Sequence, residues 1–160
     1  PIGAEIIPGL ELYGCYTREE VFTLVGRQTA EVKMQGTASG AFNLPEHNAV
    51  LLFVTLNKSE KDFSPSTQYN DYLINDEYFH WQSKNTDSHY NSGGRKYIEQ
   101  PKTGIKIILF VREEKKDGFG NTSPFHCFGL VDYVSSHDDF PMNVKWRLQK
   151  PAMAKYLKAI

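Results

Sequence analysis

The stretch Tyr69-Asn-Asp-Tyr-Leu-Ile-Asn-Asp-Glu-Tyr-Phe-His-Trp-Gln-Ser-Lys84 lies near the middle of the chain and concentrates aromatic and polar side chains. Its second half is typical of a β-strand, in which successive side chains point to opposite faces of the sheet. One face of this strand is mainly apolar, suits a core, and consists of Phe79, Trp81 and Ser83. The opposite face places donors and acceptors beside an aromatic ring and consists of Tyr78, His80 and Gln82.

The chain of 160 residues is most simply one domain, 1–160, that is large enough to bury a core. Its formal net charge of -1 gives no overall attraction to nucleic acid, although the 18 Lys and Arg leave room for a local basic face. The two cysteines, Cys15 and Cys127, favour reduced thiols of a cytoplasmic protein over a disulfide framework. No apolar run approaches the roughly 18 residues that a membrane-spanning helix needs. Because the chain begins at Pro1 without Met, we expect a fragment of a longer protein.

Hydrophobic patterning predicts mostly strands. A continuous apolar run at 49–56 indicates a central strand buried on both faces. Further strands are predicted at 30–35, 95–98, 104–112, 125–134 and, with clean alternation and one exposed face, 142–148. Within the fourth of these, Gly129 indicates a bulge. The expected fold is a β-rich α+β domain with a twisted six- to seven-stranded sheet or pseudobarrel and two or three short helices.

The helices are predicted from local end signals. Thr17-Arg-Glu-Glu20 has the pattern of a capping box that starts a short helix, and Gly26 is its expected stop. The first part of the central stretch, 69–74, is expected to form one helical turn, on which Tyr69 and Tyr72 share a face. Pro151 is expected to open a final helix.

Signatures of known enzyme classes are absent from the sequence. It contains no phosphate-binding loop, dinucleotide glycine fingerprint, His-Glu-x-x-His or Gly-x-Ser-x-Gly motif. The histidines are scattered, no spacing resembles a zinc site, and His137-Asp138-Asp139 is better explained as a solvated turn. We therefore expect no catalytic residues, metal or cofactor in this domain. A hydrolase that uses His80 or His126 is disfavoured, because no nucleophile and orienting acid occur at a recognised spacing.

The central stretch is the candidate binding site, with an ordinary interpretation beside each functional one. Phe79 and Trp81 favour a core position, since large aromatics on a strand usually pack, while one ring could still line a pocket. For His80 and Gln82, surface decoration and a ligand-reading role are equally open. Lys and Arg with small polar groups in flanking segments are the usual contacts to a phosphate backbone. The candidates for that role are Lys58, Ser59, Lys61, Lys84, Asn85, Arg95 and Lys96.

The order of segments resembles the C-terminal domain of bacterial proteins that join a phospholipase-D-type nuclease module to a superfamily II helicase. That group includes modification-dependent (type IV) restriction enzymes, which cut DNA bearing methylated or hydroxymethylated cytosine. The resembling segments cover nearly the whole chain, and Phe79-His-Trp-Gln-Ser83 is the most distinctive. The others are Leu12-Tyr-Gly-Cys-Tyr-Thr17, Phe53-Val-Thr-Leu-Asn-Lys-Ser59, 69–72, Arg95-Lys-Tyr97, Leu109-Phe-Val-Arg112, Phe128-Gly129 and 141–148.

The resemblance implies a target-reading domain for double-stranded DNA that carries 5-methylcytosine or 5-hydroxymethylcytosine. It also implies nuclease and helicase modules in the same chain and a role in phage defence in the bacterial cytoplasm. One methyl group is worth on the order of 1 kcal/mol when buried, so reliable detection needs a shaped pocket, which base flipping supplies. The expected pocket residues are Tyr69, Tyr72, His80, Trp81, Gln82 and Ser83. The alternatives are direct reading in the major groove, a sequence-specific reader of unmodified DNA, and a protein-interaction or regulatory domain of a helicase.

Overall fold

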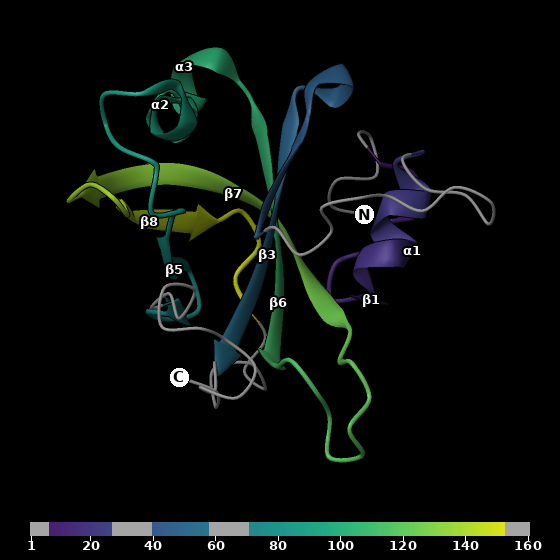
Figure 1. Cartoon of the computed structure of the whole chain (residues 1–160). Coiled ribbons are helices and arrows are strands. Elements are labelled where there is room, and N and C mark those ends of the chain that lie inside the picture. The colour runs from purple at the N-terminus through teal and green to yellow at the C-terminus, as the bar shows by residue number, and fades with distance from the viewer. Residues whose placement is uncertain (1–6, 27–39, 58–70, 153–160) are drawn as a thin grey trace.

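The computed structural model describes residues 7–26, 40–57 and 71–152, which form a mixed β-sheet with three short α-helices around it (Figure 1). In spatial order the strands are β2 (Ala41–Leu44), β3 (Ala49–Asn57), β6 (Lys106–Glu114), β7 (Phe125–His137), β8 (Asn143–Leu148), β5 (Tyr78–Gln82) and β4 (Tyr72–Leu73). A short strand, β1 (Cys15–Tyr16), pairs with the start of β7. The helices are α1 (Arg18–Leu24), α2 (Ser92–Ile98) and α3 (Gln100–Thr103), and η1 (Pro45–His47) is a 3-10 turn.

The parallel pair β3 and β6 forms the centre of the sheet and is buried on both faces. This confirms the central strand that the apolar run at 49–56 predicts. On one face lies the inner core: Val50, Leu52, Val54, Leu73, Phe79, Trp81, Tyr97, Ile107, Leu109, Val111, Phe128, Val131, Met142, Val144, Trp146, Leu148 and Ala152. On the other lies the α1 core: Ile7, Leu10, Val21, Phe22, Val25, Leu44, Ala49, Leu51, Phe53, Ile108, Phe110, Phe125, Cys127 and Leu130.

Strand β7 connects two halves of the sheet by bending. Leu109 faces Gly129 but Phe110 faces Cys127, so Phe128 is an extra residue in β7, and Gly129 has a φ of 83°. The predicted bulge at Gly129 is therefore confirmed. A second register shift lies between Tyr133 and Ser135. Figure 1 shows the result: β8 and β5 run across the molecule at a steep angle to β3 and β6.

The sheet is open, which corrects the pseudobarrel alternative. Its described strand order ends at β2 on one side and at β4 on the other, and these two ends do not pair with each other. The twisted sheet, the strand-rich α+β class and the few short helices agree with the prediction. Closure is lost because β7 bends away from β6, so that β8, β5 and β4 continue the sheet in a new direction.

Helix α1 begins and ends as its sequence signals predict. The Glu20 backbone N–H donates to Thr17 Oγ1 at 3.1 Å, and the Thr17 N–H donates to Glu20 Oε1 at 3.2 Å, which completes the capping box. Gly26 follows the helix with a φ of 77°, as expected for a C-terminal glycine. Within the described residues, no helix is long and apolar enough to cross a membrane.

Two local predictions are wrong. Residues 95–98 form the second half of helix α2, because Asn91 Oδ1 caps the helix by accepting the Gly94 N–H at 3.1 Å. Tyr72 and Leu73 form strand β4 and pair with β5, so they are not part of a helical turn. Tyr69, the strand predicted at 30–35 and the helix expected after Pro151 lie outside the described residues.

The inner core is centred on an aromatic cluster that fixes α2 against β5 and β8. Trp81 packs edge-to-face on Tyr97 with ring centroids 5.0 Å apart, and Trp146 lies 6.1 Å from Trp81 and 5.9 Å from Tyr97. Phe79 is fully buried beside them. The core interpretation of Phe79 and Trp81 is confirmed.

We predict that Gly94→Ala destabilises the fold although alanine usually stabilises a helix. A Cβ at this position would overlap the Ser88 carbonyl oxygen and the Met142 sulfur, so the helix could keep its place only by shifting. We expect a loss of about 1–3 kcal/mol in the free energy of unfolding, measured by urea denaturation. Gly118→Ala is the control, because nothing lies within 4 Å of its Cβ position. Equal stability of the two variants would contradict the packing of α2 described above.

Candidate functional site

The solvent-facing side of β4, β5 and β8 carries a set of aromatic, cationic and amide side chains that we call the outer face. Strand alternation separates these residues from the inner core, since Phe79, Trp81, Val144, Trp146 and Leu148 point the opposite way. The outer face consists of Tyr72, Tyr78, His80, Gln82, Asn143, Lys145 and Arg147. Antiparallel pairing places His80 opposite both Tyr72 and Lys145, so residues from three strands meet on one surface.

Aromatic rings and cations are interleaved on this face. Tyr72 is exposed and stacks on the His80 ring, with centroids 4.6 Å apart and planes 18° from parallel. Beside them, Lys145 Nζ lies 4.5 Å from the centroid of the Tyr78 ring, a cation–π contact. Aromatic ring faces and a positive charge therefore lie on neighbouring strands of the same surface.

Amide groups hold one end of the outer face. Gln82 Nε2 donates to Asn143 Oδ1 at 3.0 Å, and Asn143 Nδ2 donates to Asp138 Oδ2 at 3.3 Å. The Gln82 backbone N–H donates to Asp71 Oδ1 at 2.8 Å, which ties the segment before β4 to β5. At the other end, Arg147 Nη2 lies 3.7 Å from Asp132 Oδ2 in a half-exposed ion pair. These contacts orient the polar side chains, which are half-buried apart from the exposed Tyr72 and Arg147.

The structure brings some of the expected pocket residues together and separates others. Tyr72, His80 and Gln82 share the outer face. Trp81 and Ser83 do not join them: Trp81 belongs to the inner core, and the fully buried Ser83 accepts the Met142 N–H at 2.9 Å. Because strand side chains alternate, these two lie on the opposite side of β5 from His80 and pack beneath the outer face. Tyr69 lies outside the described residues.

The expected phosphate contacts are distributed in a similar way. Lys84 and Lys96 line a common hollow with Asn43, Ser92 and Gly93, which we call the lysine hollow. Lys96 Nζ donates to Asn43 Oδ1 at 2.9 Å, and burial lowers the pKa of this amine, with a smaller lowering from Lys84. Arg95 instead forms an i,i+4 ion pair with Glu99 at 2.8 Å. Asn85 is exposed just beyond β5, and Lys58, Ser59 and Lys61 lie outside the described residues.

Sequence reasoning missed Lys145 and Arg147 as members of the site. The alternation at 142–148 predicts that they face solvent, which is confirmed. Which strand lies beside them depends on long-range pairing, and β5 is more than sixty positions away along the chain. A signal was present in the alternation of Lys145 and Arg147 with Val144, Trp146 and Leu148.

A hydrogen-bonded chain ties the segment before α2 to the turn between β7 and β8. His89 Nδ1 lies 2.8 Å from Asp139 Oδ1, His89 Nε2 lies 2.7 Å from Ser136 Oγ, and Ser136 Oγ lies 2.7 Å from the Tyr133 hydroxyl. The His89 backbone N–H also donates to Asp139 Oδ1 at 2.7 Å. These bonds to His89 lower the pKa of Asp139, the backbone bond contributing most. Among the described residues, no three His, Cys, Asp or Glu side chains gather as metal ligands.

The Asp139 contacts predict a pH-dependent contribution to stability. Because folding lowers the pKa of this carboxyl, its stabilisation is fully present above the unfolded pKa of about 3.9 and is lost as the pH falls through the lower folded value. We expect Asp139→Asn to be less stable than the wild type at pH 7 and the difference to vanish at the acid end of a urea-denaturation series. Thr86→Ala, at an exposed residue without a titratable group, is the control and should show no such trend. A difference that is constant with pH would contradict a charge-based contribution.

Comparison with known proteins adds one match. No curated protein matches the chain. The family described as Domain of unknown function (DUF3427) matches residues 10–159, which is nearly the whole chain. By this match, the protein belongs to the DUF3427 family.

Proposed function

We propose that this domain binds double-stranded DNA through its outer face and reads modified cytosine there. The observation that carries the proposal is the stacked Tyr72–His80 pair beside the Lys145–Tyr78 contact on one open sheet surface. Aromatic side chains supply stacking surfaces for bases, and Lys and Arg supply phosphate contacts. Imidazole and amide groups, as in His80 and Gln82, supply hydrogen bonds to base edges.

The lysine hollow supports a phosphate-binding role. The pKa of Lys96 is lowered mainly by burial, and the Asp87 carboxylate opposes this lowering more strongly than the repulsion from Lys84 adds to it. A phosphate oxygen between the two amines would remove this repulsion and would release counterions from the DNA. Ser92 and Gly93 line the same hollow and add small polar groups.

Two arguments favour modified cytosine as the target: the physical chemistry of the added methyl group and the resemblance to a family of restriction proteins. A C5 methyl group adds a small apolar surface, so a reader needs both stacking and a shaped apolar contact, which a flipped base can have. The resemblance to the C-terminal domain of nuclease–helicase restriction proteins points to the same target. Attachment to nuclease and helicase modules stays a prediction, as does a bacterial cytoplasmic location.

The test is a titration of this chain with matched duplexes that carry cytosine, 5-methylcytosine or 5-hydroxymethylcytosine at one site. We expect binding to all three at low salt and tighter binding to at least one modified duplex, because the modified base gains the apolar contact. Absence of binding to every duplex at low salt would sink the proposal. Equal affinity for all three would leave only the reader of unmodified DNA among the DNA-binding alternatives.

Variants separate the two kinds of contact. Lys84→Gln or Lys145→Gln should weaken all duplexes alike and lower the salt dependence of binding by about one counterion. His80→Ala and Gln82→Ala should leave the fold intact and weaken the modified duplex more than the unmodified one. Lys102→Gln, which removes an exposed charge from α3, is the control and should bind like the wild type. If His80→Ala and Gln82→Ala both bind like the wild type, the outer face is not the reading surface.

A second candidate function is acyl transfer, and the chain of Asp139, His89 and Ser136 favours it. Asp139 accepts from His89 Nδ1, which leaves Nε2 facing the Ser136 hydroxyl at 2.7 Å, the arrangement of a nucleophile, base and orienting acid. Tyr133 can then donate to Ser136 Oγ. The same bonds also serve to tie two segments together, so reactivity must be measured directly.

A fluorophosphonate probe tests this candidate. If Ser136 is an activated nucleophile, mass spectrometry should locate the label on Ser136, and His89→Ala should reduce the labelling rate by at least about a hundredfold. Ser135→Ala, at the exposed neighbouring serine, should label normally. An unlabelled folded protein would rule out the acyl-transfer function and leave the chain as a structural tie.

A further inference from the structure

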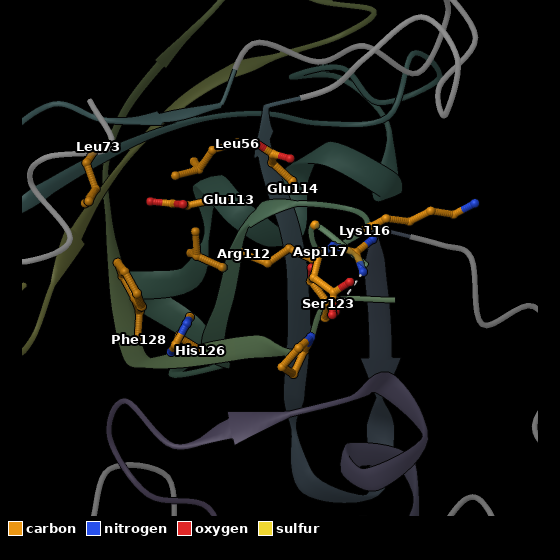
Figure 2. A pocket seen from close by; sticks show the side chains of 13 residues that line it. Leu56, Leu73, Arg112, Glu113, Glu114, Lys116, Asp117, Ser123, His126 and Phe128 are labelled. Atoms are coloured by element: carbon orange, nitrogen blue, oxygen red, sulfur yellow. Dashed lines mark hydrogen bonds between the residues drawn. The ribbon is translucent and has the colours of Figure 1, made fainter. Parts of the chain in front are cut away.

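A hollow of about 540 Å³ opens at the carboxyl ends of the parallel strands β3 and β6 (Figure 2). Its volume is in the range of about 300–1,000 Å³ that small-ligand sites occupy. We call it the strand-end hollow. One side is polar and includes Arg112, Glu114, Lys116, Asp117 and Ser123, and the other side is formed by Leu56, Leu73, Val111, Glu113, His126 and Phe128. Sequence reasoning assigned no role to this group, whose members come from four different strands.

The apolar side of the strand-end hollow is one end of the inner core. Val111 follows Leu109 on the inner face of β6, while Leu73 and Phe128 reach the same space from β4 and β7. Leu56 is partly buried against this core. A ligand that enters the hollow therefore meets apolar side chains and the ring of Phe128.

Glu113, whose side chain is exposed, places a carboxylate at the edge of this apolar side. It lies on the same face of β6 as Val111, and Figure 2 shows its side chain extending into the hollow on the side where Leu56 and Leu73 lie. Among the described residues it has no hydrogen-bond or ion-pair partner. The neighbouring Arg112 lines the polar side of the hollow but forms no ion pair with Glu113, because alternation directs its guanidinium toward the other face of the sheet. There Arg112 Nε donates to Thr55 Oγ1 at 2.8 Å and the guanidinium lies 4.3 Å from the centroid of the Phe125 ring.

An ionised carboxylate only accepts hydrogen bonds, so the hollow suits a ligand with a donor at one edge and an apolar group at another. A cytosine base has these features: its exocyclic N4 amine donates, and a C5 methyl group is apolar. Thymine carries the same methyl group but presents the O4 acceptor, which a carboxylate repels. At the position of Glu113, the hollow therefore favours 5-methylcytosine over thymine.

We propose that the strand-end hollow holds an extruded 5-methylcytosine base, with Glu113 accepting a hydrogen bond from N4 and the apolar wall contacting the C5 methyl group. This inference rests on the proposed DNA-reading function and adds a second surface to it: the outer face contacts the modified site in the duplex, and the hollow holds the extruded base. The two surfaces meet at β4, where Tyr72 belongs to the outer face and the adjacent Leu73 lines the hollow. Tyr72 thus contacts the DNA next to the point where the base leaves it.

The experiment compares two duplexes that differ only at the target base, which is either 5-methylcytosine or thymine and is paired with guanine in both. The wild type should prefer 5-methylcytosine, although the thymine–guanine mismatch is easier to open. Glu113→Gln should reduce this preference roughly tenfold, because the glutamine amide can donate to thymine O4 as well as accept from cytosine N4. Glu19→Gln removes the same charge from an exposed position of α1, outside the hollow, and should keep the wild-type preference.

Each outcome has one meaning. An unchanged preference in folded Glu113→Gln, or a wild type that binds both duplexes equally, overturns the inference about the hollow. If the wild type still distinguishes 5-methylcytosine from cytosine, the proposed function stands without it. A wild type that distinguishes neither modified duplex from the cytosine duplex overturns the proposed function and, with it, this inference. A wild type that distinguishes only 5-hydroxymethylcytosine from cytosine overturns this inference alone. If circular dichroism shows that Glu113→Gln does not fold, Glu113→Asp is tested in its place, because it keeps the charge on a shorter side chain.

Discussion

The parallel pairing of β3 with β6 is the constraint on which the rest of the structure depends. Both strands are apolar on both faces, so each face must be covered, and two separate cores result. The N-terminal segment and α1 cover one face. The other is covered by the sheet itself, because the extra residue Phe128 lets β7 bend and bring β8 and β5 back over the inner core. The outer face exists because these returning strands have nothing described on their far side.

The aromatic cluster on the inner side of β5 and β8 is stabilised by ring packing more than by hydrogen bonds. The Tyr97 hydroxyl and Trp146 Nε1 are buried without hydrogen-bond partners among the described residues, and burial raises the pKa of Tyr97. Leaving such groups unpaired costs free energy, which the close ring packing with Trp81 must offset. That packing fixes β5 from the inside. His80 and Gln82 therefore project from a strand whose position is set by its buried neighbours.

Local features of the fold could be predicted from the sequence, whereas the pairing of distant segments could not. The Thr17 capping box, the buried central strand and the Gly129 bulge each depend on residues close together in the chain. Helix α2 was missed because Gly93-Gly94 resembles a turn, while the small size of Gly94 is needed for contact with Ser88 and Met142. For the site, alternation identified the exposed side of β5. It could not place Lys145 beside His80, nor join His89 to an aspartate fifty positions away.

Arg112 and Glu113 show why the strand-end hollow has an acceptor in an apolar wall. Adjacent residues on a strand point to opposite faces, so these two charges cannot pair however close they are in sequence. Arg112 finds Thr55, the Ser123 carbonyl and the Phe125 ring on its side of the sheet. Glu113 is left at the open end of the inner core, where another apolar residue would continue the pattern of Leu109 and Val111. The Glu113 side chain is exposed there, so its carboxylate stays hydrated in the free protein and is accessible to a hydrogen-bond donor of a ligand that enters the hollow.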